Sequence, residues 1–488
     1  MDTNVLQQFD QDRAALLQAL NTDPRQFAAT LYSEVTTGPF WNRQTVTYSP
    51  YLSLNENQLC CLLGSLPLPN VAENPKVCIY STRTLLPNQG KEGETYLITS
   101  GPAPLKYFVL KVVNIDKLEV IYLTSPPSSL PKDIPTTGLC LYPDIHELSY
   151  IGVDNFTNEY LTGFILDSVY TSSTTNPNRL DGIVHFTSAT ICNQGTRKRG
   201  AIMMEYADGG DLTAFIRNPN YAYYSEQKTY NTPEGKSIKV NSVQPSVIVE
   251  IFKQVIVNLD FLHKSLEFNH GDLKVSNLLM LIKRNQGTYE GITWNSPFTV
   301  QLADFSKSSM TIPLNGDKIR IFNYSSTADK FLTVFPFKPD LGSFGGEPYY
   351  RLDSYTNTTL LAKSRHAGVP YYFSFDTYTL IISLLLIPGF FYPIMTNEQL
   401  RKIFWDVLWF PDDYSTAYRR IYAALNDKVN PSYDTILSII RDLKLKCRAH
   451  ESIMTLLGRV QTPAIPAVGT PTSAERQRLP QGPYAYQE

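Results

Sequence analysis

Cysteine and histidine are both scarce in this chain of 488 residues, which contains six of each. The cysteines form no C-x-x-C pair and show no metal-ligand spacing with the histidines, so the sequence offers no Cys/His metal site. Scattered cysteines of this kind are typical of reduced thiols. The sequence therefore predicts an intracellular, cytoplasmic protein.

A surplus of charge of one sign is also missing, because 43 Lys and Arg residues nearly balance 45 Asp and Glu residues. A formal net charge of -2 creates no field that would gather nucleic acid or an anionic membrane. The longest apolar run, Leu380 to Ile387, is shorter than the roughly 20 residues that a bilayer requires. The first residues lack the basic and apolar regions of a signal peptide. We expect neither a nucleic-acid nor a membrane partner.

The length of the chain exceeds what one hydrophobic core usually holds, so it predicts two lobes or domains with tails. Residues 1–75 are expected to form short helices and loops, as an N-terminal extension or cap. Residues 76–207 are rich in strand patterns, and residues 208–460 are mainly helical with insertions. Residues 461–488 carry Pro, Ala and polar residues without periodicity, which predicts a disordered tail.

Local patterns predict the principal elements of both lobes. Strand-like runs between turn residues predict strands within 76–86, 94–100, 106–115, 182–192 and 200–206. Helical periodicity predicts helices over 154–170, from Pro245 to about residue 262, and over 433–446. The Asn- and Tyr-rich stretch 213–245 is typical of a surface insertion, and the apolar run before Pro388 is expected to be a buried helix.

Two short motifs suggest a chemistry. The stretch "NHGDLKVSNLLM" (residues 269–280) holds Asp272, Lys274 and Asn277, and "LADFSK" holds Asp304 some thirty residues later. Transfer of a phosphoryl group needs held phosphates, a metal ion between them and a carboxylate that orients the acceptor hydroxyl. Carboxylates, an amide and a lysine at this spacing are the residue types that such a reaction uses.

These motifs resemble the catalytic loop H-R-D-L-x-x-x-N and the metal loop D-F-G of the eukaryotic-type protein kinase family. The resemblance implies that Asp272 orients the acceptor proton and that Lys274 lies near the transferring phosphoryl group. It implies that Asn277 and Asp304 bind Mg²⁺. His270 is expected to be a buried, hydrogen-bonded residue and not a proton carrier.

Upstream elements extend the resemblance in the family's order. "YFVLKVV" resembles the strand whose lysine holds the α- and β-phosphates of ATP, which points to Lys111. Glu159, in the helix expected over 154–170, is the implied ion-pair partner of that lysine, with Glu147 as the alternative. "NQGKEGETYLI" resembles a glycine-rich phosphate loop, in which Gly90 and Gly93 hold the second and third glycine positions.

"MMEYADGGDL" resembles the hinge between the two lobes of the family. Met204 would border the nucleotide, Glu205 to Ala207 would offer backbone groups to adenine, and Asp211 would reach the ribose. Asp211 equally suits the N-cap of the helix "LTAFIR", and both roles can coexist. "SFDTYTLIISLLL" resembles the central helix of the large lobe, with Asp376 bracing the catalytic loop.

Taken together, the resemblance implies an α+β fold of the bilobal protein-kinase type, with a small β-rich N-lobe and a larger, mainly helical C-lobe. The implied activity is transfer of the γ-phosphoryl group of ATP, with Mg²⁺, to a protein substrate. Lys274, two residues after Asp272, matches the subgroup that uses Ser and Thr acceptors. The sequence indicates no oligomeric state.

The chain departs from the family pattern at several places. Gly271 stands where most members have an arginine that helps to bind an activation-loop phosphate, which predicts a constitutive or partner-controlled enzyme. Ser306 replaces the glycine of D-F-G, and residues 283–297 suggest a hairpin insertion. An A-P-E element is not found. These departures, with the high Tyr and Asn content, resemble divergent kinases of large DNA viruses, so a viral protein would be expected in or near the virion.

Each singled-out residue also has a plainer interpretation. Lys111 suits a sheet edge where only its amine reaches water, and Glu159 suits a solvated helix face. Asp272, Asn277 and Asp304 are common turn formers. Two other functions also stay open: a pseudokinase that binds nucleotide or acts as a scaffold, and a kinase-like enzyme that acts on a small molecule.

Overall fold

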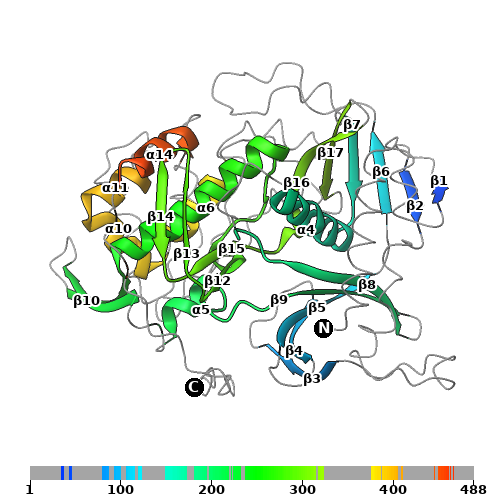
Figure 1. The fold of residues 1–488 in the computed structure, drawn as a ribbon, viewed down its shortest axis with the longest axis horizontal. Helices are drawn as coiled ribbons and strands as arrows, with labels where there is room; N and C mark the ends of the chain where they lie inside the picture. The colour runs from blue at the N-terminus through cyan, green and yellow to red at the C-terminus, as the bar shows by residue number, and fades with distance from the viewer. Residues whose placement is uncertain are drawn as a thin grey trace.

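The chain folds into a mixture of small β-sheets and helices (Figure 1). This computed structural model describes residues 35–37, 43–46, 80–86, 93–100, 106–115, 119–123, 149–172, 181–194, 197–218, 221, 224–231, 237–314, 317–323, 375–385, 387–404, 408–409, 444–445, 449–460, 462 and 465. The predicted presence of both α and β structure is confirmed. Of the tail predicted over residues 461–488, the structure describes only Thr462 and Ile465.

An antiparallel sheet of five strands contains the segments predicted as strands in residues 76–206. Its order is β3-β4-β5-β9-β8. Side chains alternate between the two faces of a strand, so Phe108, Leu110 and Val112 are buried together, and Lys111 lies on the opposite face. The bounds are β3 Tyr80–Leu85, β4 Gly93–Ser100, β5 Lys106–Ile115, β8 Phe186–Gln194 and β9 Arg197–Glu205.

The predicted helix over 154–170 is confirmed as α4 (Asn155–Ser172). Its start is set by Asp154, whose carboxylate accepts bonds from the amide (3.0 Å) and hydroxyl (2.7 Å) of Thr157. Figure 1 shows α4 next to β8 on one side and next to β16 and β17 on the other. This position lets the helix contact two different sheets.

A second sheet has six strands in the order β1-β2-β6-β7-β17-β16. All of its pairs are antiparallel except β7 with β17, which run parallel. Strands β1 and β2 fall within residues 1–75, so the expectation of only helices and loops there is wrong at these strands, which are too short to show a period of two. The bounds are β1 Val35–Thr37, β2 Arg43–Val46, β6 Glu119–Leu123, β7 Ser149–Val153, β16 Ser309–Leu314 and β17 Asp317–Asn323.

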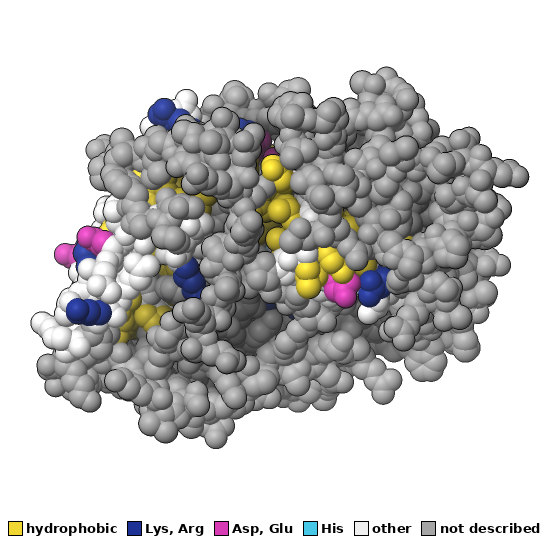
Figure 2. All heavy atoms as spheres, turned by 90° about the horizontal axis from the view of Figure 1, so that it is seen from below, with side chains coloured by type: hydrophobic (Ala, Val, Ile, Leu, Met, Phe, Trp, Pro, Cys, Tyr) yellow, Lys and Arg dark blue, Asp and Glu magenta, His cyan; other side chains and the backbone are white. Residues whose placement is uncertain are grey.

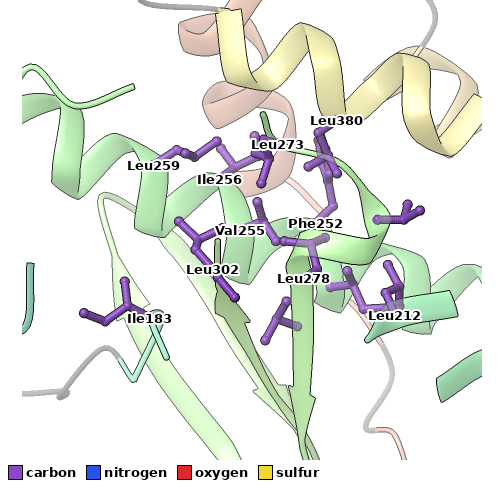
Figure 3. Packing of buried hydrophobic residues seen from close by; sticks show 14 of the residues in the cluster. Ile183, Leu212, Phe252, Val255, Ile256, Leu259, Leu273, Leu278, Leu302 and Leu380 are labelled. Carbon is purple, nitrogen blue, oxygen red and sulfur yellow. The ribbon is translucent and has the colours of Figure 1, made fainter. Parts of the chain in front are cut away.

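The helix predicted after Gln244 is confirmed as α6 (Pro245–Leu266), which begins at a proline and ends at Glu267 in the left-handed conformation. In Figure 3, α6 directs Phe252, Val255 and Ile256 toward three leucines. These are Leu278 and Leu302 in the neighbouring strands and Leu273 in the loop before them. Those strands are β12 (Leu278–Leu281) and β15 (Thr299–Leu302), an antiparallel pair, and the short helix α5 (Leu212–Arg217) lies next to β12.

Two hairpins occupy the predicted insertions. Strands β10 (Ser225–Asn231) and β11 (Ser237–Val243) pair within the stretch predicted as a surface insertion. Strands β13 (Asn285–Tyr289) and β14 (Ile292–Ser296) confirm the hairpin predicted in residues 283–297. Its two turn residues both have positive φ, as a tight two-residue hairpin turn requires.

Helices complete the C-terminal part of the described chain: α9 Phe375–Leu385, α10 Pro388–Thr396, α11 Glu398–Phe404 and α14 Ala449–Gly458. Among described residues no single helix is long and apolar enough to cross a membrane; α9 with α10 meets the length and composition test only as a pair bent by 95°. The predicted helix over 433–446 is wrong at β19 (Lys444–Leu445), which pairs with β18 (Leu408–Trp409).

One cysteine differs from the expectation of reduced thiols. Cys192 in β8 is buried and disulfide-bonded, so that expectation is wrong at this residue. Sequence spacing does not show which cysteines meet in the fold. On the face shown in Figure 2, the described basic side chains lie at separate places, and an acidic group lies next to one of them.

Replacing Phe252 by Ala should lower the free energy of unfolding by about 3 to 5 kcal/mol, because it removes a ring buried in the core. The ring also packs on that of Phe404, with centroids 4.3 Å apart. Urea unfolding followed by circular dichroism measures the loss. The matched control is Leu85→Ala, where the leucine is 54% exposed, and the two variants should not unfold at the same urea concentration.

Candidate active site

The loop that carries the first motif, residues 269–277 (the HGD loop), is held by a buried carboxylate. Asp376, at the start of α9, accepts hydrogen bonds from the amides of His270 (2.7 Å) and Gly271 (2.9 Å). Burial raises the pKa of Asp376, and the hydrogen bonds from these two amides oppose the rise. The bracing role expected for Asp376 is what its contacts show.

His270 is a structural residue of this loop. Its ring is fully buried, and Nε2 lies 2.8 Å from the carbonyl oxygen of Ala303. Since a carbonyl oxygen can only accept, Nε2 carries the proton, and Nδ1 accepts the long bond of 3.4 Å from the amide of Asp272. The ring therefore ties the HGD loop to the segment before Asp304, as expected.

Asp272 lies between two ammonium groups. Lys274 Nζ is 3.3 Å from Asp272 Oδ2, and Lys307 Nζ is 3.2 Å from the same oxygen. The Asp272 side chain is only 12% exposed, so these charges meet where water screens them weakly. Asn277 fixes the loop from within, because its Nδ2 donates to the backbone oxygen of Asp272 at 2.8 Å.

Asn277 directly precedes β12, and Asp304 follows β15. Leu278 and Leu302 form the end pair of this ladder, and the amide of Ala303 donates to the Asn277 carbonyl at 3.0 Å, so the two predicted metal ligands lie beyond the same end of the strand pair, Asn277 by one residue and Asp304 by two. One carboxylate and one amide oxygen suit Mg²⁺, which takes few protein ligands and completes its shell with phosphate and water oxygens. Among the described residues, no group of three or more His, Cys, Asp or Glu side chains could hold a metal by itself.

Lys111 joins two carboxylates from distant parts of the chain. Its Nζ lies 2.8 Å from both carboxylate oxygens of Glu159 in α4 and 3.1 Å from Asp304 Oδ1. Glu159 is 2% exposed, so the plainer interpretation of a solvated helix face does not hold. The pairing chosen from the sequence over Glu147 is the one observed; Glu147 lies outside the described residues.

The charges of this site act on one another. Burial opposes the charge on Lys111, but Asp304 and Glu159 outweigh it and raise the pKa of Lys111 above its ordinary value. Burial also opposes the charge on Asp304, but Lys111, Lys274 and Lys307 lower its pKa below the ordinary range. The pKa of Asp304 therefore depends both on Lys111 and on the two lysines next to Asp272.

The turn that carries Asp304, residues 304–307 (the DFS turn), has an unusual backbone. Asp304 adopts a left-handed conformation with φ of 64°, which is strained for a residue other than glycine. Ser306 donates its hydroxyl to Asp304 Oδ1 at 3.0 Å. The glycine-to-serine departure thus adds a hydrogen bond to the predicted metal ligand, beyond the change in flexibility expected from the sequence.

Asn158, the residue before Glu159, holds the DFS turn against α4. Its Nδ2 donates to the backbone oxygens of Phe305 at 3.0 Å and Ser308 at 2.9 Å, and more weakly to Ser306 at 3.2 Å. Asn323 at the end of β17 also donates to the Ser306 oxygen. These amides couple the position of Glu159 to that of Asp304.

Arg320 in β17 fixes the segment after the DFS turn. Its guanidinium is fully buried and donates to Asn269 Oδ1 (3.1 Å), Ser309 Oγ (2.9 Å) and Thr311 Oγ1 (2.9 Å). The backbones of Asn269 and Ser309 also exchange two hydrogen bonds, of 2.8 and 2.9 Å. The hairpin β16–β17 is thereby attached to the beginning of the HGD loop.

The predicted hinge residues comprise the last two residues of β9, Met204 and Glu205, and the residues that follow the strand. Met204 is buried in the five-stranded sheet, and the amide of Glu205 donates to the oxygen of His185 at 2.9 Å. The Ala207 carbonyl accepts a hydrogen bond of 3.0 Å from the amide of Gly210. Asp211 caps α5 by accepting a bond of 2.7 Å from the amide of Ala214, which confirms the capping role.

The predicted phosphate-loop glycines are described only in part. Gly90 lies outside the described residues. Gly93 begins β4, and a Cβ there would lie 2.3 Å from the carbonyl oxygen of Val112. Close approach of β5 is therefore sufficient to explain a glycine at position 93.

Sequence reasoning missed three residues of this site: Lys307, Asn158 and Arg320. Two of them carry a signal in hindsight, since Lys307 closes the "LADFSK" motif and Asn158 precedes Glu159. Arg320 carries none, because only the pairing of β16 with β17 brings it to the HGD loop. Comparison with models of known protein families and with curated proteins found no match.

Replacing Lys111 by Met should make stability less dependent on pH at both extremes. Because the pKa of Asp304 is lowered in the folded state, its contribution is present above the ordinary value of 3.8 and is lost as the pH falls. Because the pKa of Lys111 is raised, its contribution is present below 10.5 and is lost as the pH rises. The difference in free energy of unfolding between wild type and Lys111→Met should therefore be largest between pH 3.8 and pH 10.5.

Urea unfolding of wild type and variant at acid, neutral and alkaline pH measures this difference. Lys318→Met is the control, since Lys318 is an exposed lysine 3.5 Å from a glutamate. If the difference in free energy of unfolding between wild type and Lys111→Met were the same at every pH, the prediction would be wrong, because the charges of Lys111 and Asp304 would then not contribute to folding stability.

Proposed function

We propose that this chain is an ATP-dependent protein kinase that transfers the γ-phosphoryl group to Ser or Thr hydroxyls of a protein substrate. The observation that carries the proposal is the ion-pair network of Lys111 with Glu159 and Asp304, at 2.8 and 3.1 Å. A lysine from a sheet, a glutamate from a helix and an aspartate from a loop meet next to a second group, Asp272 with Lys274. Their order along the chain is that of the kinase family.

A bilobal, kinase-like arrangement is part of the same proposal. The five-stranded antiparallel sheet with α4 would form the N-lobe, and α6 with the helices that follow would form the C-lobe. Residues 205–211 would join the two lobes. The support is the element order, together with the bracing of the HGD loop by Asp376 from α9.

The proposed mechanism uses residues in distinct roles. Lys111, oriented by Glu159, binds the α- and β-phosphates. Asp272 accepts the proton of the acceptor hydroxyl as the hydroxyl oxygen bonds to the γ-phosphorus. The bond from phosphorus to the β–γ bridging oxygen breaks with its electron pair, which leaves on ADP. Lys274 binds the transferring group near Asp272.

Asn277 and Asp304 would hold Mg²⁺, which when bound neutralises charge on the β- and γ-phosphates. The carbonyl of Glu205 and the amide of Ala207 would contact adenine, since the Glu205 amide is engaged with His185. Asp211 would reach the ribose with a carboxylate oxygen while it caps α5. Gly90 and Gly93 keep their proposed place near the phosphates.

A nucleotide-binding pseudokinase is the second candidate, and one observation favours it. Both proposed acidic groups already have cationic partners: Asp272 contacts two lysines, and Asp304 contacts Lys111. If these pairs persist when nucleotide binds, Asp272 cannot take a proton efficiently. Binding would then occur without transfer.

Transfer of labelled phosphate from ATP with Mg²⁺ to a generic basic protein tests the proposal. Asp272→Asn should lower the rate by at least about 10²-fold, because the proton acceptor is lost, and Lys111→Met should abolish transfer. The thermal stabilisation by ATP should persist in Asp272→Asn and shrink in Lys111→Met, because only the latter loses a phosphate ligand.

Stabilisation by ATP without any transfer in wild type would favour the pseudokinase. Absence of both transfer and stabilisation would end the nucleotide interpretation. Lys318→Ala is the matched control and should transfer like wild type, because Lys318 is an exposed lysine of β17, 3.5 Å from Glu267, with no role in the proposed mechanism.

Control by phosphorylation of the segment after Asp304 is not expected. Ser308, Ser309 and Thr311 are buried and hydrogen-bonded, so Ala substitutions there would disturb packing whatever the mode of regulation. The sharper test is phosphatase treatment of the purified protein, after which the transfer rate should be unchanged. A loss that returns on incubation with ATP would show that a phosphate is required.

A further inference from the structure

Lys307 is the cation of the site with no assigned role. Its Nζ lies 3.2 Å from Asp272 Oδ2, the same oxygen that Lys274 approaches at 3.3 Å. Its side chain is 24% exposed, so it contacts both the site and solvent. Across the site, the ammonium groups of Lys111, Lys274 and Lys307 match the carboxylates of Glu159, Asp272 and Asp304, so two cations are concentrated at the Asp272 end.

The backbone of Lys307 is held in place from two sides. Asn158 donates to the carbonyl oxygens of Phe305 and Ser308, which flank it. On the other side lies Gly271, with φ of 76°, and a Cβ at that position would lie 2.2 Å from the Lys307 carbonyl oxygen. The φ angle disfavours a side chain at position 271, and the contact with a backbone oxygen leaves no room for a Cβ unless the backbone shifts.

We propose that Lys307 is a second catalytic lysine, which binds the γ-phosphoryl oxygens during transfer, and that Gly271 is a glycine in order to admit it. This inference rests on the proposed function and deepens it. The unusual residue at position 271 and the additional lysine then have one explanation, because the glycine lets the backbone of residue 307 approach and so brings the Lys307 side chain to Asp272.

The chemistry of transfer gives Lys307 a role in addition to charge neutralisation. When the acceptor oxygen bonds to the γ-phosphorus and the bond to the bridging oxygen breaks, negative charge spreads over three equatorial oxygens. An ammonium group next to Asp272 can exchange the carboxylate for one of these oxygens as the carboxylate takes the hydroxyl proton. Lys274 and Lys307 would together supply two such cations in a site that water screens weakly.

The first test compares Lys307→Ala, Lys307→Arg and the control Lys318→Ala. Lys307→Ala should lower kcat by about 10²-fold, the usual effect of losing one charged donor to the transition state, with little change in the KM for ATP. Lys307→Arg should restore part of the rate, and Lys318→Ala should match wild type. An unchanged or raised kcat in Lys307→Ala would overturn the proposal, because it would make Lys307 neutral or inhibitory.

A binding measurement separates this inference from the activity itself. Wild type should be stabilised more by a non-hydrolysable ATP analogue than by ADP, both with Mg²⁺, and Lys307→Ala should lose this difference while keeping the stabilisation by ADP. This result would support the γ-phosphate contact even in a chain that transfers nothing. Equal analogue-over-ADP differences in wild type and Lys307→Ala, or no stabilisation by nucleotide, would overturn it.

Gly271 is tested by a double-mutant cycle. Gly271→Ala should lower kcat in the wild-type background by displacing the Lys307 backbone, and it should lower kcat little further in the Lys307→Ala background. Equal fold-losses in the two backgrounds would overturn the link between the two residues. Melting temperatures of all four proteins show whether each variant is folded.

Discussion

The ion-pair network of Lys111, Glu159 and Asp304 is the interaction on which the organisation of this site depends. It joins β5, α4 and the DFS turn, three segments separated by as many as 193 positions in the chain. Taking these charges out of water costs free energy that their attraction only partly returns, so such a network is a poor stabiliser. The network instead fixes the geometry of the site, because a buried charge is tolerated only where a charge of opposite sign lies next to it.

A second layer of hydrogen bonds fixes the positions of the loops around this network. Asn158 donates to the DFS turn, Arg320 donates to Asn269 and to the segment after that turn, and Asp376 holds the amides of the HGD loop. Buried amides and guanidinium groups are costly when unpaired, so these contacts restrict the two loops to one arrangement. The hydrophobic core around α6 supplies the rigid base, since Leu273 and Leu302 pack beside it (Figure 3).

The six-stranded sheet gives the segment after the DFS turn an unusual anchor. Strand β17 carries Arg320 and pairs in parallel with β7, which leads directly into α4. The strand, the helix and the turn therefore form a closed set of contacts around Asp304. Strand pairing and the buried guanidinium of Arg320 hold this segment.

The sequence by itself determined the local elements and most of the candidate site. Helices α4 and α6, the strands of the five-stranded sheet and the β13–β14 hairpin follow from periodicity and turn residues, which act over a few neighbours. The pairing of Lys111 with Glu159 and the bracing by Asp376 came from motif order. Failures occurred where local signals are weak: strands β1 and β2 are very short, and β19 interrupts a helical pattern.

Only the tertiary structure decided which distant residues complete the site. Arg320 reaches Asn269 because β16 pairs with β17, and Lys307 reaches Asp272 because Gly271 leaves room for its backbone. The disulfide at Cys192 likewise follows from the tertiary structure and not from the spacing of cysteines in the sequence. Contacts between residues far apart in sequence depend on strand register and close packing, which no local pattern of residues encodes.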